Sequence, residues 1–171
     1  MHHARKFVFI AILALIAGCS SSYQPPLTYT YDKERVYAKP YNEVRQKVVD
    51  WFASKEIPMG KVTDSTGIIS VEYKLPSDDF NPESEHRSCD CGKPGSSMSE
   101  TQRIKNAIAM FEVVIKSVDD RNTKVIANIN YKAELYMNEY GSETMGDSFL
   151  HALKCPSTGR LEKELMDFVG Q

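Results

Sequence analysis

The strongest constraint on the fold of this chain is a strictly alternating stretch over residues 125–137. Its odd positions are all apolar, whereas its even positions include Asn128, Asn130, Lys132 and Glu134. Successive side chains of a β-strand point to opposite faces, so this alternation predicts a strand with one buried and one solvated face. Residues 125–137 are therefore expected to form an amphipathic strand.

Residues 104–118 predict the partner of this strand. Phe111, Val113 and Ile115 share one face, and residues 119–122 (Asp-Asp-Arg-Asn) have the composition of a hairpin turn. Three further strands are expected upstream, at residues 34–38, 59–62 and 69–75. Residues 141–154 leave a short helix and irregular chain as open alternatives.

Two helices are expected from apolar residues spaced one helical turn apart. The stripe of the first, over residues 41–55, consists of Val44, Val48, Trp51 and Phe52. The stripe of the second consists of Leu161, Leu165 and Phe168, with Ser157 or Thr158 as its expected N-cap. The order of elements predicts an α+β fold, in which an antiparallel sheet of about four to five strands carries two helices on one face.

The N-terminus has the layout of an export signal. Basic Arg5 and Lys6 precede an apolar run over residues 7–16, and small residues lead to Cys19. The run is too short to span a bilayer, which takes about 20 apolar residues. It resembles a bacterial lipoprotein signal, which implies cleavage before Cys19 and acylation of that residue. Because Ser20 follows, the resemblance implies an outer-membrane address facing the periplasm.

This pattern divides the chain into three parts. Residues 1–18 are the expected signal peptide, residues 19–31 the lipidated cysteine with a polar, proline-containing flexible tether, and residues 32–171 a single α+β domain. Without residues 1–18 the chain keeps 19 basic and 23 acidic side chains. This acidic balance argues against nucleic acid as a partner.

The domain contains an unusually long connection over residues 76–103, rich in Ser, Pro, Gly and charge. Loops of this length in compact domains are functional or disordered, or else need a restraint such as a cross-link. Cys89 and Cys91 lie in the loop, and Cys155 precedes the last helix. In an oxidising compartment a disulfide from Cys155 to either Cys89 or Cys91 is the expected restraint.

A metal site is the competing interpretation of these cysteines. Together with two histidines they offer five nitrogen and sulfur ligands: His86, Cys89, Cys91, His151 and Cys155. The single residue between Cys89 and Cys91 does not suit a tetrahedral zinc site, although copper(I) tolerates it. We therefore expect a structural disulfide, with no metal and no cofactor.

A family resemblance rests on residues 40–52 and 67–69. Pro40-Tyr41 opens a helix that ends in Trp51-Phe52, and Gly67-Ile68-Ile69 opens a strand. This pattern is similar to small envelope lipoproteins with helix-grip domains, such as the lipoprotein C component of the outer-membrane β-barrel assembly machinery. The resemblance implies a helix-grip fold. That component has two domains and lacks the Cys-Asp-Cys loop, so its role does not carry over with the fold.

A second resemblance concerns the end of the chain. Residues 155–165 are similar to the end of a group of poorly characterised Gram-negative lipoproteins.

No catalytic signature follows Cys19. His151 and Cys155 would lie one turn apart on a helix, but no orienting acid accompanies them, and the acidic pairs Asp78-Asp79 and Asp119-Asp120 are expected in solvated turns. We expect a non-catalytic interaction or scaffold module that is lipid-anchored through Cys19 and binds an envelope protein. The alternative is a periplasmic small-molecule or metal (zinc or copper) binder, and an enzyme ranks third.

Overall fold

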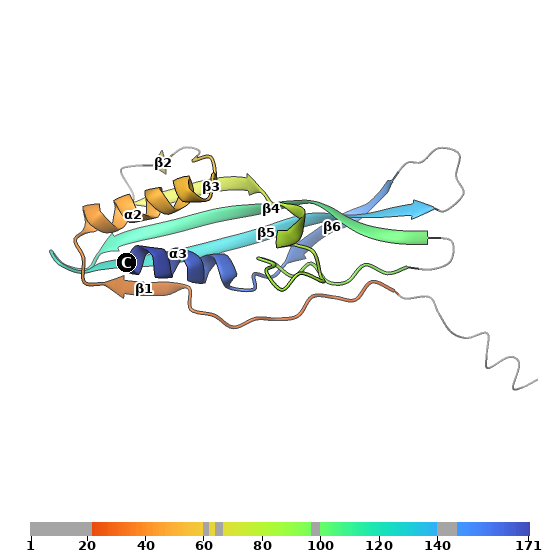
Figure 1. The fold of residues 1–171 in the computed structure, drawn as a ribbon, viewed down its shortest axis with the longest axis horizontal. Coiled ribbons are helices and arrows are strands. Elements are labelled where there is room, and N and C mark those ends of the chain that lie inside the picture. Colours follow the sequence, from red (N-terminus) through yellow and green to blue (C-terminus); the bar gives the residue numbers. More distant parts are fainter. Residues whose placement is uncertain (1–21, 60–61, 64–66, 97–99, 140–146) are drawn as a thin grey trace, which may run out of the picture.

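The computed structural model describes residues 22–59, 62–63, 67–96, 100–139 and 147–171. The expected signal peptide and Cys19 lie outside these ranges. Within them, strands form one antiparallel sheet in the order β1-β5-β4-β3-β2, with β6 also paired to β5 (Figure 1). The strands are β1 (Glu34–Tyr37), β2 (Val62–Thr63), β3 (Ile68–Lys74), β4 (Glu100–Ser117), β5 (Thr123–Glu139) and β6 (Ser148–Cys155).

The predicted hairpin forms the two longest strands of this sheet. Strands β4 and β5 pair from Ser117 opposite Thr123 to Glu100 opposite Glu139. The register shifts between Lys105 and Ile108, where Asn106 adopts a left-handed backbone with φ of 52°. Such a bulge inserts an extra residue, so that even positions of β4 before it and odd positions after it lie on the same face of the sheet. The core face of β5 follows the predicted alternation and is buried from Val125 to Leu135 at every odd position.

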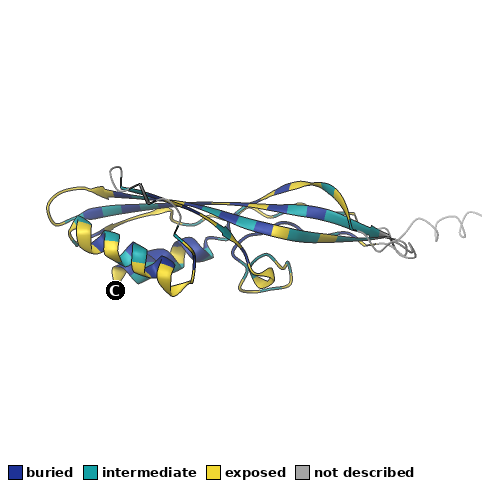
Figure 2. Ribbon diagram, turned by 90° about the horizontal axis from the view of Figure 1, so that it is seen from above, coloured by how far each residue is buried: buried dark blue, intermediate teal, exposed yellow. Residues whose placement is uncertain are grey.

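Helices α2 (Tyr41–Ser54) and α3 (Arg160–Gly170) both cover the same face of the sheet (Figure 2). The predicted face of α2 is confirmed, because Val44, Val48, Trp51 and Phe52 are its buried residues. The rings of Trp51 and Phe52 meet the ring of Phe111 on β4 edge to face, with centroids 6.1 and 5.4 Å away. The α+β fold with two helices on one face is therefore confirmed.

Helix α3 differs in two details from the expectation. Leu161 and Leu165 are buried as predicted, but Phe168 is only partly buried, and Met166 and Val169 complete the buried stripe. Its N-cap is Gly159, with φ of 83° and no capping side chain, so the predicted cap by Ser157 or Thr158 is wrong. The Thr158 hydroxyl instead donates to the carbonyl oxygen of Arg87, because the chain before α3 is bonded to the loop.

Several element boundaries also differ from the sequence expectations. Residues 148–155, for which no strand was assigned, form β6 along the edge of β5. Strand β4 begins at Glu100, so the last residues of the expected loop 76–103 belong to the sheet. Of the expected strand at 59–62, Met59 is not in a strand and β2 covers Val62–Thr63, while residues 60 and 61 lie outside the described ranges. Pairing with neighbouring strands, which sequence periodicity does not report, extends or shifts each of these elements.

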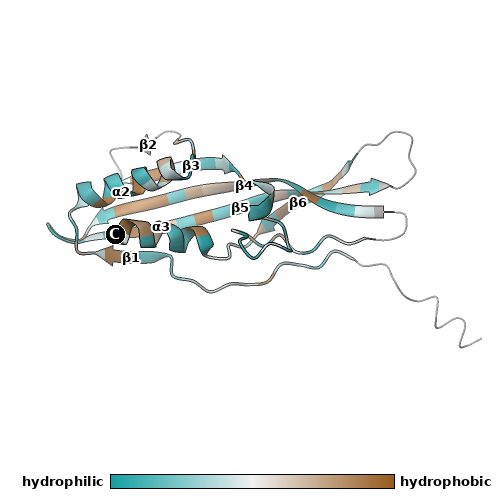
Figure 3. Ribbon diagram, in the orientation of Figure 1, coloured by the Kyte–Doolittle hydropathy of each residue, from teal (hydrophilic) through white to brown (hydrophobic). Residues whose placement is uncertain are grey.

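The sheet can be divided along its length into three zones, according to what covers the face that carries the helices. Helices α2 and α3 cover one end, residues 76–96 cover the middle, and the ends of β4, β5 and β6 extend beyond both as an arm (Figures 1 and 2). We call residues 76–96 the cysteine loop; they include the short 3-10 turn η1 (Ser77–Asp79). Figure 3 shows the loop to be largely hydrophilic. It therefore needs cross-links and hydrogen bonds, rather than an apolar face of its own, to stay in place.

Candidate functional site: the cysteine cluster and the N-terminal strap

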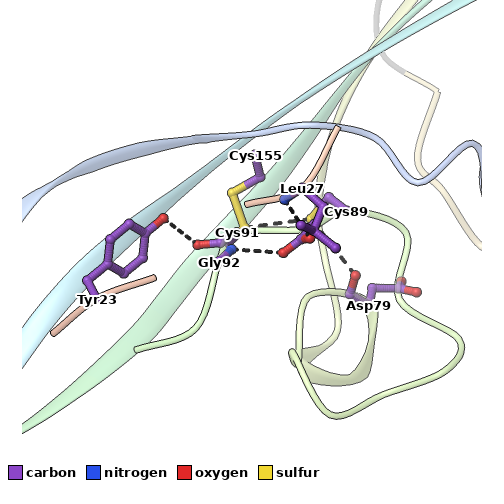
Figure 4. Close-up of a disulfide and its surroundings, with 8 residues drawn as sticks. Tyr23, Leu27, Asp79, Cys89, Cys91, Gly92 and Cys155 are labelled. Carbon is purple, nitrogen blue, oxygen red and sulfur yellow. Dashed lines mark hydrogen bonds between the residues drawn. A yellow bond between two sulfur atoms is a disulfide. The ribbon is translucent and has the colours of Figure 1, made fainter. Parts of the chain in front are cut away.

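A disulfide joins Cys91 in the cysteine loop to Cys155 at the end of β6 (Figure 4). The two Cα atoms are 4.4 Å apart across a sequence separation of 64 residues. The sequence had left Cys89 and Cys91 as alternative partners. The structure selects Cys91 because residues 88–91 run antiparallel to residues 155–158, with Asp90 N–H donating to the Pro156 oxygen at 2.9 Å.

Cys89 is the remaining thiol of this cluster. It is fully buried, and its Sγ lies 3.8 Å from the Cys91 Sγ. Burial raises the pKa of the Cys89 thiol to about 12, and the nearby carboxylates of Asp79 and Asp90 contribute to the rise. The thiolate is the nucleophilic form of cysteine, so Cys89 is inert at neutral pH.

Asp90 lies between the two loop cysteines and binds the N-terminal segment. Its carboxylate accepts hydrogen bonds from Leu27 N–H at 3.1 Å, the Tyr29 hydroxyl at 2.8 Å and Gly92 N–H at 2.9 Å. Arg87 adds an ion pair at 3.7 Å. Burial by itself raises the pKa of Asp90, but these hydrogen bonds and the guanidinium outweigh burial and hold the pKa below its usual value.

Residues 22–33, here called the N-terminal strap, run along the domain surface. Gln24 and Lys93 exchange two backbone hydrogen bonds of 2.9 Å, and the Tyr23 hydroxyl donates to the Cys91 oxygen at 2.7 Å. The sequence predicted a flexible tether over residues 19–31. Among the described residues 22–31, Tyr23, Gln24, Leu27 and Tyr29 form hydrogen bonds to the cysteine loop, contacts that composition alone does not reveal.

Beneath the strap lies a buried polar cluster that sequence reasoning missed. Glu162 is completely buried in the first turn of α3, and its Oε2 accepts a hydrogen bond of 2.9 Å from the Ser157 hydroxyl. Burial raises the pKa of Glu162 and also that of the neighbouring Tyr131. The Tyr131 hydroxyl has no hydrogen-bond partner among the described residues. Glu162 resembled a solvated helix residue in the sequence, and no local signal marks it as buried.

The expected metal ligands are brought together only in part. The three sulfur atoms of Cys89, Cys91 and Cys155 lie within 4.8 Å of one another, and neither His86 nor His151 belongs to this group. His86 is exposed, and His151 packs edge to face on Tyr23 with ring centroids 6.5 Å apart. With the disulfide intact, the cluster offers one thiol, so metal binding would require its reduction.

The structure is also incompatible with a nucleophile pair formed by His151 and Cys155. His151 and Cys155 lie on strand β6 rather than on a helix, about 13 Å apart along the chain, and Cys155 is oxidised. The expected turn at Asp119 is confirmed, since its carboxylate accepts hydrogen bonds from the N–H groups of Arg121 and Asn122.

No protein-family model matches the chain, and no curated protein matches its sequence. None of the helices in the described ranges is long and apolar enough to cross a membrane.

Proposed function

We propose that this protein is a lipid-anchored, non-catalytic interaction module of the Gram-negative envelope, held at the periplasmic face of the outer membrane through Cys19. The signal-like pattern before Cys19 motivates the anchor. The disulfide between Cys91 and Cys155 agrees with export, because such bonds persist in oxidising compartments. The high pKa of the Cys89 thiol argues against a thiol enzyme.

The docked strap is the observation that carries this proposal. Tyr23 and Gln24 are bonded to the cysteine loop, and only four residue steps separate Cys19 from Tyr23. A chain of that length reaches at most about 14 Å. An acylated Cys19 would therefore keep the domain close to the bilayer surface, whereas a free tether would let it move away. This suits a module that presents one fixed surface to a partner.

The arm formed by β4, β5 and β6 is the surface we assign to the partner. Its strands extend beyond the helices and the cysteine loop, and the outer edge of β6 has no strand partner in the described ranges (Figure 1). Phe149 on β6 is 55 % exposed and contacts Tyr136 edge to face. An open edge of this kind accepts an extended segment of another protein by strand addition.

Fractionation tests the anchor, and crosslinking in cells tests the interaction. The Cys19→Ala variant should lose fatty-acid labelling and leave the membrane fraction. A photo-crosslinking amino acid at position 149 should capture a defined envelope protein. Position 118 is a matched control, because Val118 is 58 % exposed but lies at the turn before β5. Equal capture at both positions, or none at position 149, would contradict the interaction role of the arm.

A second candidate function, a soft-metal binder, rests on the sulfur cluster. After reduction, Cys89, Cys91 and Cys155 would offer three buried thiols within 4.8 Å, which suits copper(I) better than zinc. Reduced protein should then bind one equivalent of copper(I), and Cys89→Ser should weaken binding. If the reduced wild-type protein takes up no copper(I) or zinc, this candidate is wrong.

A further inference from the structure

Strands β1 and β6 pair with the same edge of β5 but leave a gap between them. β1 pairs with residues 123–126, and β6 pairs with residues 131–137. In the gap, Ala127 N–H donates to the Lys33 oxygen at 2.8 Å, and the strap passes along the rest (Figure 1). Backbone groups alternate in direction along an antiparallel strand, so the N–H and C=O of Ile129 also face this gap.

A cavity of about 760 Å³ lies in this gap. We call it the notch. Strap residues 28–31 and Lys33 line one side, and residues 129–132 and 154–157 line the other. Residues 28 and 30 are threonines, whose hydroxyl groups can donate hydrogen bonds to a ligand oxygen, whereas the Tyr29 hydroxyl already donates to Asp90.

The notch is positively charged. Lys33, Lys132 and Lys154 reach it from three separate segments, and none of the described residues that line it is acidic. None of these three lysines forms an ion pair with a described residue, although Lys33 interacts electrostatically with the buried carboxyl group of Glu162. The chain as a whole carries 23 acidic and 21 basic side chains. The side chains that line the notch are therefore positively charged, whereas the chain as a whole has a slight excess of acidic side chains.

Two of the three lysines are direct cross-strand neighbours. Lys132 lies opposite Lys154 in the pairing of β5 and β6. Like charges in this position destabilise a strand pair. The sheet contains a second such pair, Lys116 opposite Lys124, but there Glu34 contacts Lys124 at 2.7 Å. No acidic side chain among the described residues forms an ion pair with Lys132 or Lys154 in the same way.

We propose that the notch binds a phosphate group, supplied by a soluble phosphorylated compound or by a lipid headgroup. Lys132 and Lys154 hold two ammonium groups side by side, which suits a multiply charged anion, and lysine is a common phosphate ligand. The bound anion would lie beside Lys132 and Lys154. It would offset their repulsion there, as Glu34 does for the pair formed by Lys116 and Lys124. This site is independent of the partner surface on the arm.

Thermal unfolding of the full lipidated chain in a zwitterionic detergent tests the site. The probes are glycerol 3-phosphate and inorganic phosphate at constant ionic strength, and vesicles with and without phosphatidylglycerol for the headgroup. A hundredfold excess of a soluble probe over its Kd should raise the unfolding temperature by about 5 to 10 °C. Vesicle binding is measured with the Cys19→Ala variant, which lacks the lipid anchor, and a dependence on phosphatidylglycerol and on the lysines would identify the headgroup as the source.

A double variant and a matched control separate specific binding from general attraction. Lys132→Gln with Lys154→Gln should weaken binding about tenfold or more. Lys74→Gln with Lys116→Gln removes two exposed lysines from the same sheet that do not line the notch, and should leave binding unchanged. Equal losses in both double variants, or no response to any probe, would overturn the proposal.

Discussion

Asp90 shows how one side chain connects the strap to the domain. It is 5 % exposed, and three hydrogen bonds reach its carboxylate from Leu27, Tyr29 and Gly92. Each donor stabilises the charged form of the carboxylate. Protonation of Asp90 therefore weakens the attachment of the strap.

The direction of the Asp90 pKa shift predicts an acid-dependent stability. The folded pKa lies below the unfolded value of about 3.9, so the stabilisation is present above that pH and is lost as the pH falls through the folded pKa. Asp90→Asn should lower the free energy of unfolding at pH 7 by about 1 to 3 kcal/mol. Urea titrations from pH 7 to pH 2.5 should show a smaller acid loss in the variant. An unchanged pH profile would contradict this role.

Cys89 provides a test of burial at a single thiol. Its pKa of about 12 predicts almost no alkylation of Cys89 by iodoacetamide at pH 8 in the native protein, and alkylation of Cys89 after denaturation without reductant. Intact mass measures both. Rapid alkylation of the native protein would show that Cys89 is accessible or ionised.

At the scale of elements, the strap and the cysteine loop form one unit. The strap contributes Tyr23, Gln24 and Tyr29, and the loop contributes the groups that bind them. Gly92 has φ of 78°, and a Cβ atom there would lie 2.2 Å from the Gln24 oxygen. Only glycine permits this close contact.

Gly92→Ala should therefore detach the strap and leave the helix layer in place. Hydrogen exchange should rise in residues 23–31 and stay unchanged in α2. Gly170→Ala is the control, because its Cβ would meet its nearest neighbour, the ring of Tyr37, at an ordinary 3.6 Å. Protection of the strap in Gly92→Ala equal to that in the control would show that the close contact is not needed.

At the scale of the whole molecule, the disulfide closes a long loop between the sheet and a hydrophilic segment. A bond between residues 64 positions apart stabilises a fold by about 4 kcal/mol in the chain-entropy model. The double variant Cys91→Ser with Cys155→Ser should lose a comparable free energy of unfolding. Its unfolding temperature should fall by about 8 to 16 °C.

Reduction provides the control for this prediction. Dithiothreitol should destabilise the wild-type protein to a similar extent and leave the double variant unaffected in urea titrations. A wild-type midpoint that does not respond to complete reduction would show that hydrogen bonds alone hold the cysteine loop.

The sequence by itself determined the hairpin, the face of α2 and the α+β class. These features depend on local periodicity, since every apolar residue of a strand or helix must reach the same side, as Val125 to Leu135 and Val44 to Phe52 do. The cysteine content and the expectation of export likewise limited the disulfide to two pairings.

Only the tertiary structure decided the features that depend on distant neighbours. Pairing along the edge of β5 made residues 148–155 a strand, and the antiparallel approach of residues 88–91 to residues 155–158 chose Cys91 over Cys89. The same packing buried Glu162 and brought Lys33 to the cavity that Lys132 and Lys154 also line. Contacts between segments far apart in the chain leave no periodic trace in the sequence, because each segment alone keeps the composition of a solvated one.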